Sequence, residues 1–344
     1  MAALKYLWGL TDTLQFIVFT TYWHIQVPAI AEAVIKTLKF VALGEFIPYE
    51  GIKSWIGERL GQPPANSDEI EAIEATGGGS SNFLENLDSL LLFALAIFVV
   101  ILFVALFSCF KYINYKVFRT YMLIRNAIFW NVFIRYSLQS YTKMCFATVI
   151  SLELIKWGSA KLVISNLMAI GTAVALLVLP VIYAYVLHKK KPDLIKYTVR
   201  SRIGSLYSGK KEEETAGQVF VLIYLARRLW FTFLTFALAS QPHILVHLFM
   251  MNTLHYMIYI GFGEPYTSLL QWRVEIVNEF LLLTQNYYFV LYAGLVSDRK
   301  ALDSIGLAHV MHLGVLIIFN FTVITVINIS SICRKLHLMK LESE

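Results

Sequence analysis

The sequence is poor in charged residues. Only 15% of its 344 residues are charged, whereas 58% are hydrophobic, and the mean hydropathy is +0.62. Soluble globular domains carry about 25% charged residues, so this composition excludes an ordinary soluble protein. No polar block of about 100 residues offers a second, separately folded core. We therefore predict one integral membrane domain that covers residues 1–344.

Cysteine and the usual catalytic signatures are also scarce. The three cysteines, Cys109, Cys145 and Cys333, each lie near a predicted cytosolic helix end, which excludes a disulfide framework. The P-loop, GxSxG, dinucleotide, CxxC and HEXXH motifs are all missing from the sequence. We therefore expect a protein that is not an enzyme, with no metal and no cofactor. The potassium-filter sequence TVGYG is missing too, so nothing indicates potassium selectivity.

Long apolar runs are the main feature that is present. A membrane-spanning helix needs about 20 predominantly apolar residues, and such runs recur from one end of the chain to the other. Their continuity excludes a β-barrel, whose strands alternate at every second residue. The predicted fold is an all-α, polytopic transmembrane helical bundle with about eight crossings. These are residues 6–25, 90–107, 143–156, 162–187, 219–239, 243–261, 272–295 and 308–332. The run 143–156 contains Glu153 and needs part of the preceding segment to reach bilayer length.

The distribution of charge predicts the orientation. The net charge is +6, and the basic residues gather in segments 110–143 and 188–217, which we expect in the cytosol with both termini. This topology explains the positive net charge, so we expect no nucleic-acid partner. Segment 26–85 is expected outside, as an amphipathic helix over 29–43 followed by an acidic loop. That helix lies against the membrane or folds back into it, with Glu32, Lys36 and Lys39 exposed. The glycine-rich residues 77–82 are native or an engineered join, which the sequence leaves open.

Several segments carry a resemblance. The runs LTDTLQF, EFIP, GGGSSNFLENLDSLLL, IFWNVFIRYSLQSY, LARRLWF and EPYTSLLQWRVEIVNEF occur in this order. Together they resemble the multi-pass region of cysteine-rich surface proteins of protists, which is similar to the fungal TRP-like family and distantly linked to TRP and polycystin-type channels. The resemblance implies a cation channel. A large ectodomain is usual in that family, but this chain begins at Met1 almost at the membrane, so an ectodomain's anchoring or receptor role is not carried over.

A polar stripe interrupts the apolar run from Trp272 to Leu295. It consists of Glu275, Asn278, Glu279, Gln285 and Asn286. A carboxylate in hydrocarbon costs several kcal/mol, so the stripe should face other helices or water. One interpretation is a cation pathway, in which the glutamates recruit cations at the inner mouth and the amides contact them near mid-membrane. Alternatively, the stripe joins helices, with Arg273 or Arg227 neutralising a glutamate, or the glutamates lie in the headgroup layer.

Other polar residues have both functional and structural interpretations. Arg227 and Arg228, with Lys210 and Lys211, form a candidate lipid-headgroup site, although arginines at helix ends commonly snorkel to the membrane surface. Two histidine pairs, His243 with His247 and His309 with His312, lack a neighbouring cysteine or carboxylate, so packing or hydrogen bonding is expected for them. Asn320 and Asn328 lie in sequons within the last span, where we expect interhelical hydrogen bonds rather than glycans.

Three functional hypotheses follow. The first is a TRP-like cation channel subunit that conducts ions through a helical bundle. The second is a non-catalytic, membrane-embedded structural or anchoring subunit of a larger assembly, and the third is a transporter or lipid scramblase. The expected partners are membrane lipids and either further copies of the chain or a larger membrane assembly. A plasma or ciliary membrane is expected rather than an internal one.

Overall fold

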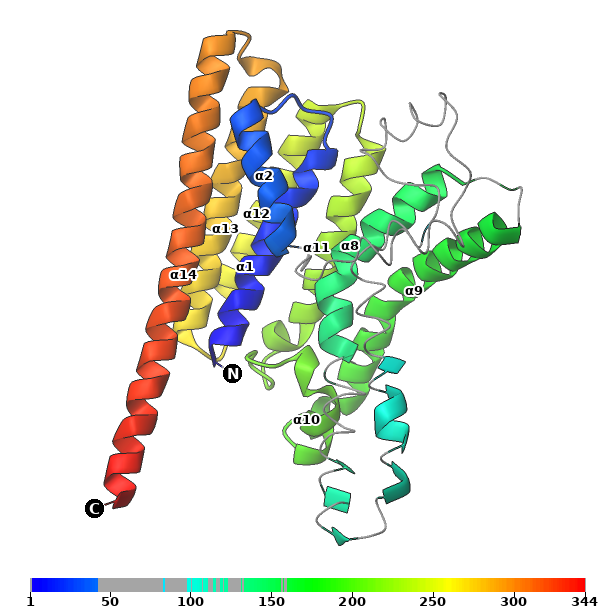
Figure 1. The fold of residues 1–344 in the computed structure, drawn as a ribbon, viewed down its shortest axis with the longest axis vertical. Coiled ribbons are helices and arrows are strands. Elements are labelled where there is room, and N and C mark those ends of the chain that lie inside the picture. Colours follow the sequence, from blue (N-terminus) through cyan, green and yellow to red (C-terminus); the bar gives the residue numbers. More distant parts are fainter. Residues whose placement is uncertain are drawn as a thin grey trace. The chain divides into compact units, whose positions relative to one another are not determined.

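The computed structural model describes residues 2–42, 133–155 and 160–343, together with residue 157 and short stretches between 83 and 131. Within these ranges most residues are helical and no strand is formed, which confirms the all-α prediction for the described part of the chain (Figure 1). The chain divides into two compact units, Met1–Glu45 with Ala237–Glu344 and Phe46–Phe236. Each unit is described by itself.

The first unit contains five long helices. They are α1 (Ala2–Phe19), α2 (Ala29–Ala42), α12 (Pro242–Gly263), α13 (Leu269–Val290) and α14 (Arg299–Ser343). Helix α1 packs against α2, α13 and α14, and α13 packs against α12 as well. Every residue from Thr13 to Thr20 is buried. A helix segment that is buried all round lies at the centre of its bundle, so the second half of α1 forms the middle of this unit, packed against α13.

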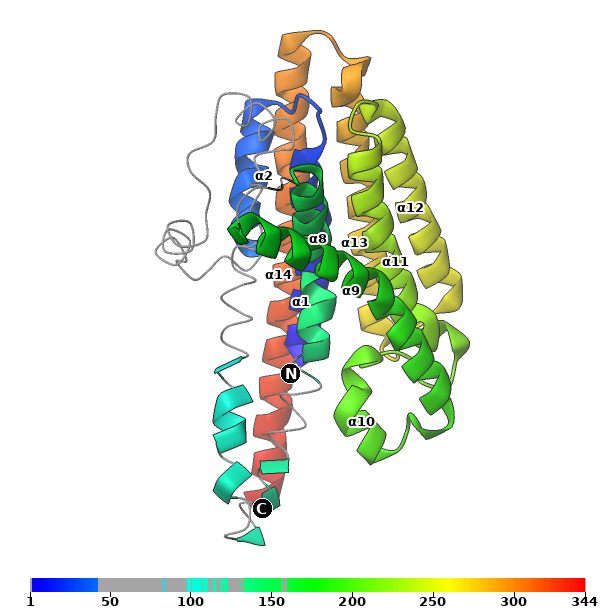
Figure 2. The same ribbon diagram turned by 90° about the vertical axis from the view of Figure 1, so that its right-hand side faces the viewer.

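Helix α2 is folded back along α1. Its buried residues Ala31, Ile35, Leu38 and Ala42 recur at three- and four-residue steps and form one face, which packs against α1 and α14 (Figures 1 and 2). The helix predicted for residues 29–43 is therefore present, and it packs along α1. Its polar face carries exposed Lys36 and Lys39, while Glu32 is half-buried and pairs with Lys36 at 2.6 Å.

Aromatic rings hold α1, α12 and α13 together. Trp23, which follows the short 3-10 turn Thr20–Tyr22, makes edge contacts with Phe249 of α12 at 5.5 Å and Phe289 of α13 at 5.2 Å between ring centroids. Phe16 adds a contact with Phe249 at 5.6 Å. Each such pair contributes about 0.5–1.5 kcal/mol beyond the burial of its area. This cluster fixes where α13 runs through the unit.

Two glycines allow close approaches in this unit. A Cβ at Gly306 of α14 would lie 2.7 Å from Cβ of Pro28, so only glycine lets α14 approach the start of α2. Gly294 has a φ of 114° within the π-helical turn Leu291–Leu295 that follows α13. L-residues with a side chain rarely adopt that conformation. Gly294 therefore allows the chain to leave α13 and turn back into α14.

The second unit is built on α8 (Phe133–Glu153), α9 (Ala160–Lys190), α10 (Tyr197–Ile203) and α11 (Thr215–Ala237). Short 3-10 turns cover Ser108–Phe110, Lys191–Asp193 and Gly204–Leu206. Helices α8 and α9 pack together. The Tyr141 hydroxyl donates to the Leu176 carbonyl at 2.9 Å, and Ser137 shares a 2.7 Å hydrogen bond with Tyr183. These bonds connect α8 to α9 through polar groups in an otherwise apolar core.

Four helices are long and apolar enough to cross a membrane. They are Leu162–Asp193, Thr215–Ala237, Pro242–Gly263 and Arg299–Arg334, searched within the described residues. Side chains such as Val181 and Ile318, which are 66% and 67% exposed, give these helices apolar outer faces suited to lipid. The chain is therefore a membrane protein with at least these candidate spans.

The predicted count of about eight crossings is not confirmed. The predicted runs 6–25, 143–156 and 272–295 do form helices, as α1, α8 and α13, but none of them is among the four helices that are long and apolar enough to cross a membrane. Polar residues on α1 and α13 lower their mean hydropathy, and the two helices pack against each other within the first unit. Helix α8 begins at Phe133, within the segment expected in the cytosol. The run 90–107 lies mostly outside the described residues.

Candidate functional site

The polar stripe on α13 is buried, and it is divided into two rows. Asn278, Glu279, Gln285 and Asn286 are 0–4% exposed, and Glu275 is half-buried. Residues seven apart share one face of a helix, so Asn278 and Gln285 form one row and Glu279 and Asn286 form another. The five residues predicted to act together therefore have two different sets of neighbours.

The first row is joined to α14. Asn278 Nδ2 donates to Asn320 Oδ1 at 3.2 Å, and Asn320 Nδ2 donates back to Asn278 Oδ1 at 2.8 Å. Asn320 also donates to the Leu316 carbonyl at 3.0 Å. The interhelical hydrogen bond predicted for Asn320 is confirmed. Asn328 is exposed, and in the described part of the chain it makes no such bond, so the same prediction is wrong for that residue.

Further along the first row, the partner on α14 is a histidine. The side chain of Gln285 contacts Nε2 of the fully buried His309, whose Nδ1 shares a 2.9 Å hydrogen bond with the Tyr292 hydroxyl. The Tyr288 ring stacks on His309 at 4.8 Å. The hydrogen-bonding role expected for His309 is confirmed. The sequence signal for Tyr292 is its position seven residues after Gln285, which puts both on one helix face.

His312 makes a separate link between the same two helices. Its Nε2 lies 3.0 Å from the Thr284 hydroxyl and 3.0 Å from the Leu281 carbonyl. The expected hydrogen-bonding role of this histidine is therefore also confirmed. Of the other predicted pair, His247 bonds through Nδ1 to the His243 carbonyl at 2.7 Å, and both side chains are exposed. The hydrogen bond of this second pair therefore lies within α12, while the His243 ring lies close to Gly294.

The two glutamates gather around a buried tyrosine at the start of α13. Tyr266, in the connection from α12, is 4% exposed, and its pKa is raised well above its ordinary value. Burial is the largest cause, followed by the negative charge of Glu275, and Glu279 adds to it. Tyr266 also hydrogen-bonds Glu275, whose Oε2 would lie 3.4 Å from a Cβ at Gly9 of α1. Sequence reasoning did not identify Tyr266.

Deeper in the unit, several amide atoms have no protein partner. Both Nδ2 and Oδ1 of Asn286 are buried without a hydrogen bond, and so are Oε1 of Gln285 and Nδ2 of Asn252 on α12. Leaving such an atom unpaired costs about 1–3 kcal/mol. Water commonly occupies positions of this kind, because it can both donate and accept, and a cation can bind the amide oxygens but not the N–H groups. The second row therefore ends at Asn286, whose unpaired amide is suited to bind a small polar guest.

The predicted headgroup residues have different surroundings. Arg228 is 1% exposed, donates through Nη1 to Thr142 Oγ1 at 2.5 Å and lies 4.3 Å from the Tyr224 ring centroid. Arg227 is 6% exposed. The snorkelling expected for this pair is therefore not observed, because both side chains are buried.

The two lysines of that prediction differ from each other. Lys210 is buried, with its Nζ 3.4 Å from the centroid of the Phe220 ring. Lys211 forms an ion pair with Glu214 at 3.1 Å. Headgroup binding by the four residues stays a prediction, and Lys211 is the least buried of them.

No group of three or more histidine, cysteine, aspartate or glutamate side chains placed to hold a metal ion occurs within the described residues.

No family model, curated protein or solved structure matches this chain. The resemblance to the TRP-like and polycystin-related regions therefore stays a prediction.

Proposed function

We propose that the chain is a subunit of a cation channel and that Glu275, together with the second row of α13, Glu279 and Asn286, contacts the permeating ion. The observation that carries this proposal is Asn286, which is 0% exposed and has two unpaired side-chain atoms in the middle of a helix bundle. An amide oxygen in such a place replaces part of the hydration shell of a cation. The binding of an ion or of water would offset the cost of its burial.

The positions along α13 support a pathway. Glu279 and Asn286 are seven residues apart, which corresponds to about 10 Å along a helix axis. Glu275 is the nearest of the three to the start of α13, Glu279 lies at the middle of the helix and Asn286 nearer its end. In this proposal the carboxylates concentrate cations and Asn286 contacts them further along the helix.

The first row has another role in this proposal. Asn278 and Gln285 are engaged with Asn320 and His309, so they hold α13 against α14. Of the five residues predicted to contact the ion, this proposal therefore keeps three: Glu275, Glu279 and Asn286. We place the protein in a plasma or ciliary membrane with both termini in the cytosol, as an assembly of several copies in contact with lipid through its basic segments.

The test is a recording of ionic current from the purified full chain in planar bilayers. Glu279→Gln should lower the unitary cation current by about twofold or more at low salt, because it removes a charge that concentrates ions. The reduction should shrink at high salt, where that charge is screened. Asn286→Ala should change the current at all salt concentrations, because it removes a direct ligand.

Matched controls are Glu214→Gln, an acid outside α13 that is paired with Lys211, and Asn328→Ala, an exposed amide on α14. Both should conduct like the unchanged chain. Bilayers that stay silent under voltage, calcium and stretch would contradict the channel proposal. A current that is unaffected by either α13 variant would place the ion path elsewhere.

A second candidate function is a structural or anchoring subunit of a larger membrane assembly. The reciprocal Asn278–Asn320 pair favours it, because these polar groups bond to each other and not to a guest. Stable co-purification of the chain with other subunits, together with the absence of current from the isolated chain, would support this function over conduction.

A further inference from the structure

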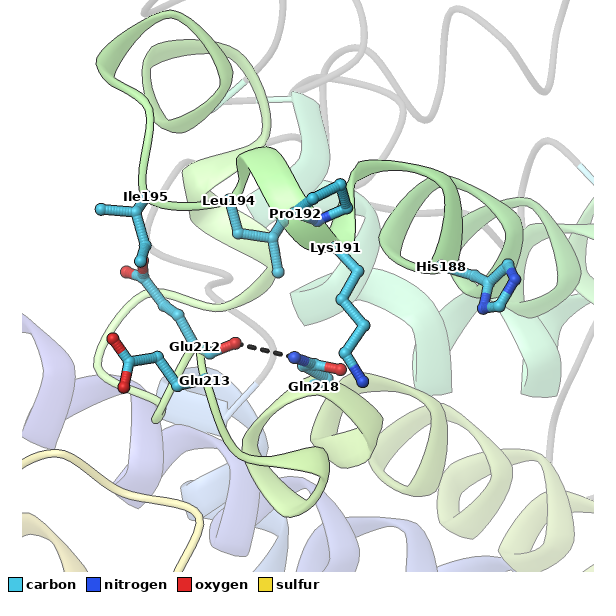
Figure 3. Close-up of a pocket in the computed structure, with 8 residues that line it drawn as sticks. All are labelled: His188, Lys191, Pro192, Leu194, Ile195, Glu212, Glu213 and Gln218. Atoms are coloured by element: carbon cyan, nitrogen blue, oxygen red, sulfur yellow. Dashed lines mark hydrogen bonds between the residues drawn. The ribbon is translucent and has the colours of Figure 1, made fainter.

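A pocket of about 510 Å³ lies at the end of α9, within the second unit (Figure 3). Its volume is within the range of about 300–1,000 Å³ that is usual for small-ligand sites. The side chains that line it are His188, Lys191, Pro192, Leu194, Ile195, Glu212, Glu213 and Gln218. Its lining includes none of the five polar residues of α13 and none of the four basic residues discussed above.

Opposite charges enter the pocket from different segments. His188 comes from the end of α9 and Lys191 from the turn after it. Glu212 and Glu213 come from the segment before α11 (Figure 3). Lys191 and Glu213 form no ion pair with each other or with another described residue, although opposite charges at a protein surface commonly pair. The pocket is thus equipped for a ligand that carries a negative and a positive charge together.

The walls of the pocket are held by specific contacts. Gln218 Nε2 donates to the Glu212 carbonyl at 2.8 Å, and Arg200 pairs with the Glu212 carboxylate at 3.6 Å. On the other wall, the Tyr207 hydroxyl donates to the Leu194 carbonyl at 2.9 Å. Glu212 is therefore occupied, which leaves the Glu213 carboxylate to accept from a cationic ligand group.

The location of the pocket indicates a ligand from the membrane. Helix α9 belongs to the candidate span Leu162–Asp193, and its Val181 and Ile182 are exposed about two helical turns before His188. Tyr185 and Lys189 share a 3.2 Å hydrogen bond just before it. Tyrosine and lysine at the end of an apolar helix typically mark the level of the lipid headgroups. The apolar side chains of Leu194 and Ile195 suit the less polar part of a lipid.

We propose that this pocket binds a phospholipid headgroup that carries a phosphate and a primary ammonium, as in phosphatidylethanolamine. Lys191 donates to the phosphate, and Glu213 accepts from the ammonium. A choline headgroup is disfavoured, because quaternary ammonium groups are recognised by the rings of Trp, Tyr and Phe, and none of the eight lining residues is one of these. The proposal is independent of ion conduction.

The test is native mass spectrometry of the purified full chain, titrated with phosphatidylethanolamine, phosphatidylcholine and phosphatidylglycerol. Lys191→Gln and Glu213→Gln should each weaken ethanolamine-lipid binding by about fivefold, the factor that corresponds to about 1 kcal/mol for a partly exposed charged contact. Lys190→Gln and Glu214→Gln make the same changes of charge at neighbouring exposed positions outside the pocket, and they should leave binding unchanged.

Phosphatidylglycerol binding should fall in Lys191→Gln but not in Glu213→Gln, because it has no ammonium. Equal losses in pocket and control variants would overturn the proposal, as would equal affinity for all three lipids in the unchanged chain. Soluble phosphoethanolamine distinguishes the source. If it displaces the lipid only in large excess, the occupant is a membrane lipid, and if it competes at equal concentration, the occupant is a soluble ligand with the same chemistry.

Discussion

At the scale of single residues, the first unit depends on amides that bond across helices. Each partner of the Asn278–Asn320 pair is buried, with both bonds inside the bundle. Asn278→Ala or Asn320→Ala should therefore lower the free energy of unfolding by about 1–3 kcal/mol, since either change leaves a buried amide unpaired. The measurement is denaturant unfolding of the purified chain in detergent.

The double variant tests whether these two amides act as a pair. Its loss should be smaller than the sum of the two single losses, by about 0.6 kcal/mol, the average coupling of interhelical hydrogen bonds in membrane proteins. Asn328→Ala, an exposed change on the same helix, should alter unfolding by less than about 0.5 kcal/mol. Fully additive losses would show that the hydrogen bonds in the structure carry no coupling.

Tyr207 gives a prediction about pH, outside the spanning helices. Burial, with a contribution from the charge of Glu212, raises the pKa of Tyr207 to about 12 from the ordinary 10.0. Between these two pH values the unfolded chain loses this proton while the folded chain keeps it. The contribution to stability is therefore complete below pH 10 and is lost as the pH rises toward about 12.

The measurement is the thermal unfolding midpoint of the full chain between pH 9 and pH 12, compared with that of Tyr207→Phe. The variant loses the hydrogen bond to Leu194, so it should be less stable at pH 9 by about 1 kcal/mol. The difference between the two proteins should then narrow as the pH rises. A constant difference across this range would contradict the assignment.

At the scale of elements, the position of α2 against α14 depends on Gly306, which has no side chain. A methyl group at Gly306 would lie 2.7 Å from Pro28, whereas one at Gly314 on the same helix would meet nothing within 4 Å. Gly306→Ala should therefore destabilise the protein by about 1–3 kcal/mol through overpacking. Gly314→Ala should be neutral or stabilising by up to about 1 kcal/mol, because alanine favours a helix more than glycine does.

Both glycine variants are compared by chemical unfolding of the full chain under identical conditions. Because each change adds the same methyl group to α14, the difference in propensity cancels and the contact with Pro28 is what distinguishes them. Equal stability of Gly306→Ala and Gly314→Ala would mean that α2 does not lie against α14 in the way the structure has it.

At the scale of the whole molecule, the number of crossings depends on α13. If α12 and α13 both cross the membrane, the turn at Ser240 and the turn at Ser297 lie on one side, and the connection at Thr267 lies on the other. These three positions are exposed. Single cysteines at each position, in a chain without Cys109 and Cys333, can be labelled in sealed vesicles with an impermeant maleimide.

Ser240→Cys and Ser297→Cys should react from the outside, whereas Thr267→Cys and Ser208→Cys should react only after permeabilisation. This pattern follows from the basic loop 188–217, which is expected in the cytosol. Labelling of Thr267 and Ser297 from the same side would show that α13 does not cross. The same result would contradict the proposed ion pathway along the second row of α13.

Much of the fold follows from the chain alone. Helical runs, the amphipathic residues 29–43 and the hydrogen-bonding roles of Asn320, His309 and His312 were predicted, because helix periodicity and the cost of buried polar groups are local properties. The split of the α13 stripe was not predicted. Asn278 and Asn286 differ in their partners only because α14 packs on one side of α13.

The residues 272–295 by themselves determined that α13 would be a helix with a stripe of polar side chains turned away from lipid. Only the tertiary structure decided which of them are satisfied. Asn278 is paired because Asn320 lies opposite, and Tyr266 lies beside Glu275 because the α12–α13 connection returns to that end. Asn286 faces no such partner. The reason is physical: hydrogen bonds act over about 3 Å, and which atoms come that close is set by how helices pack.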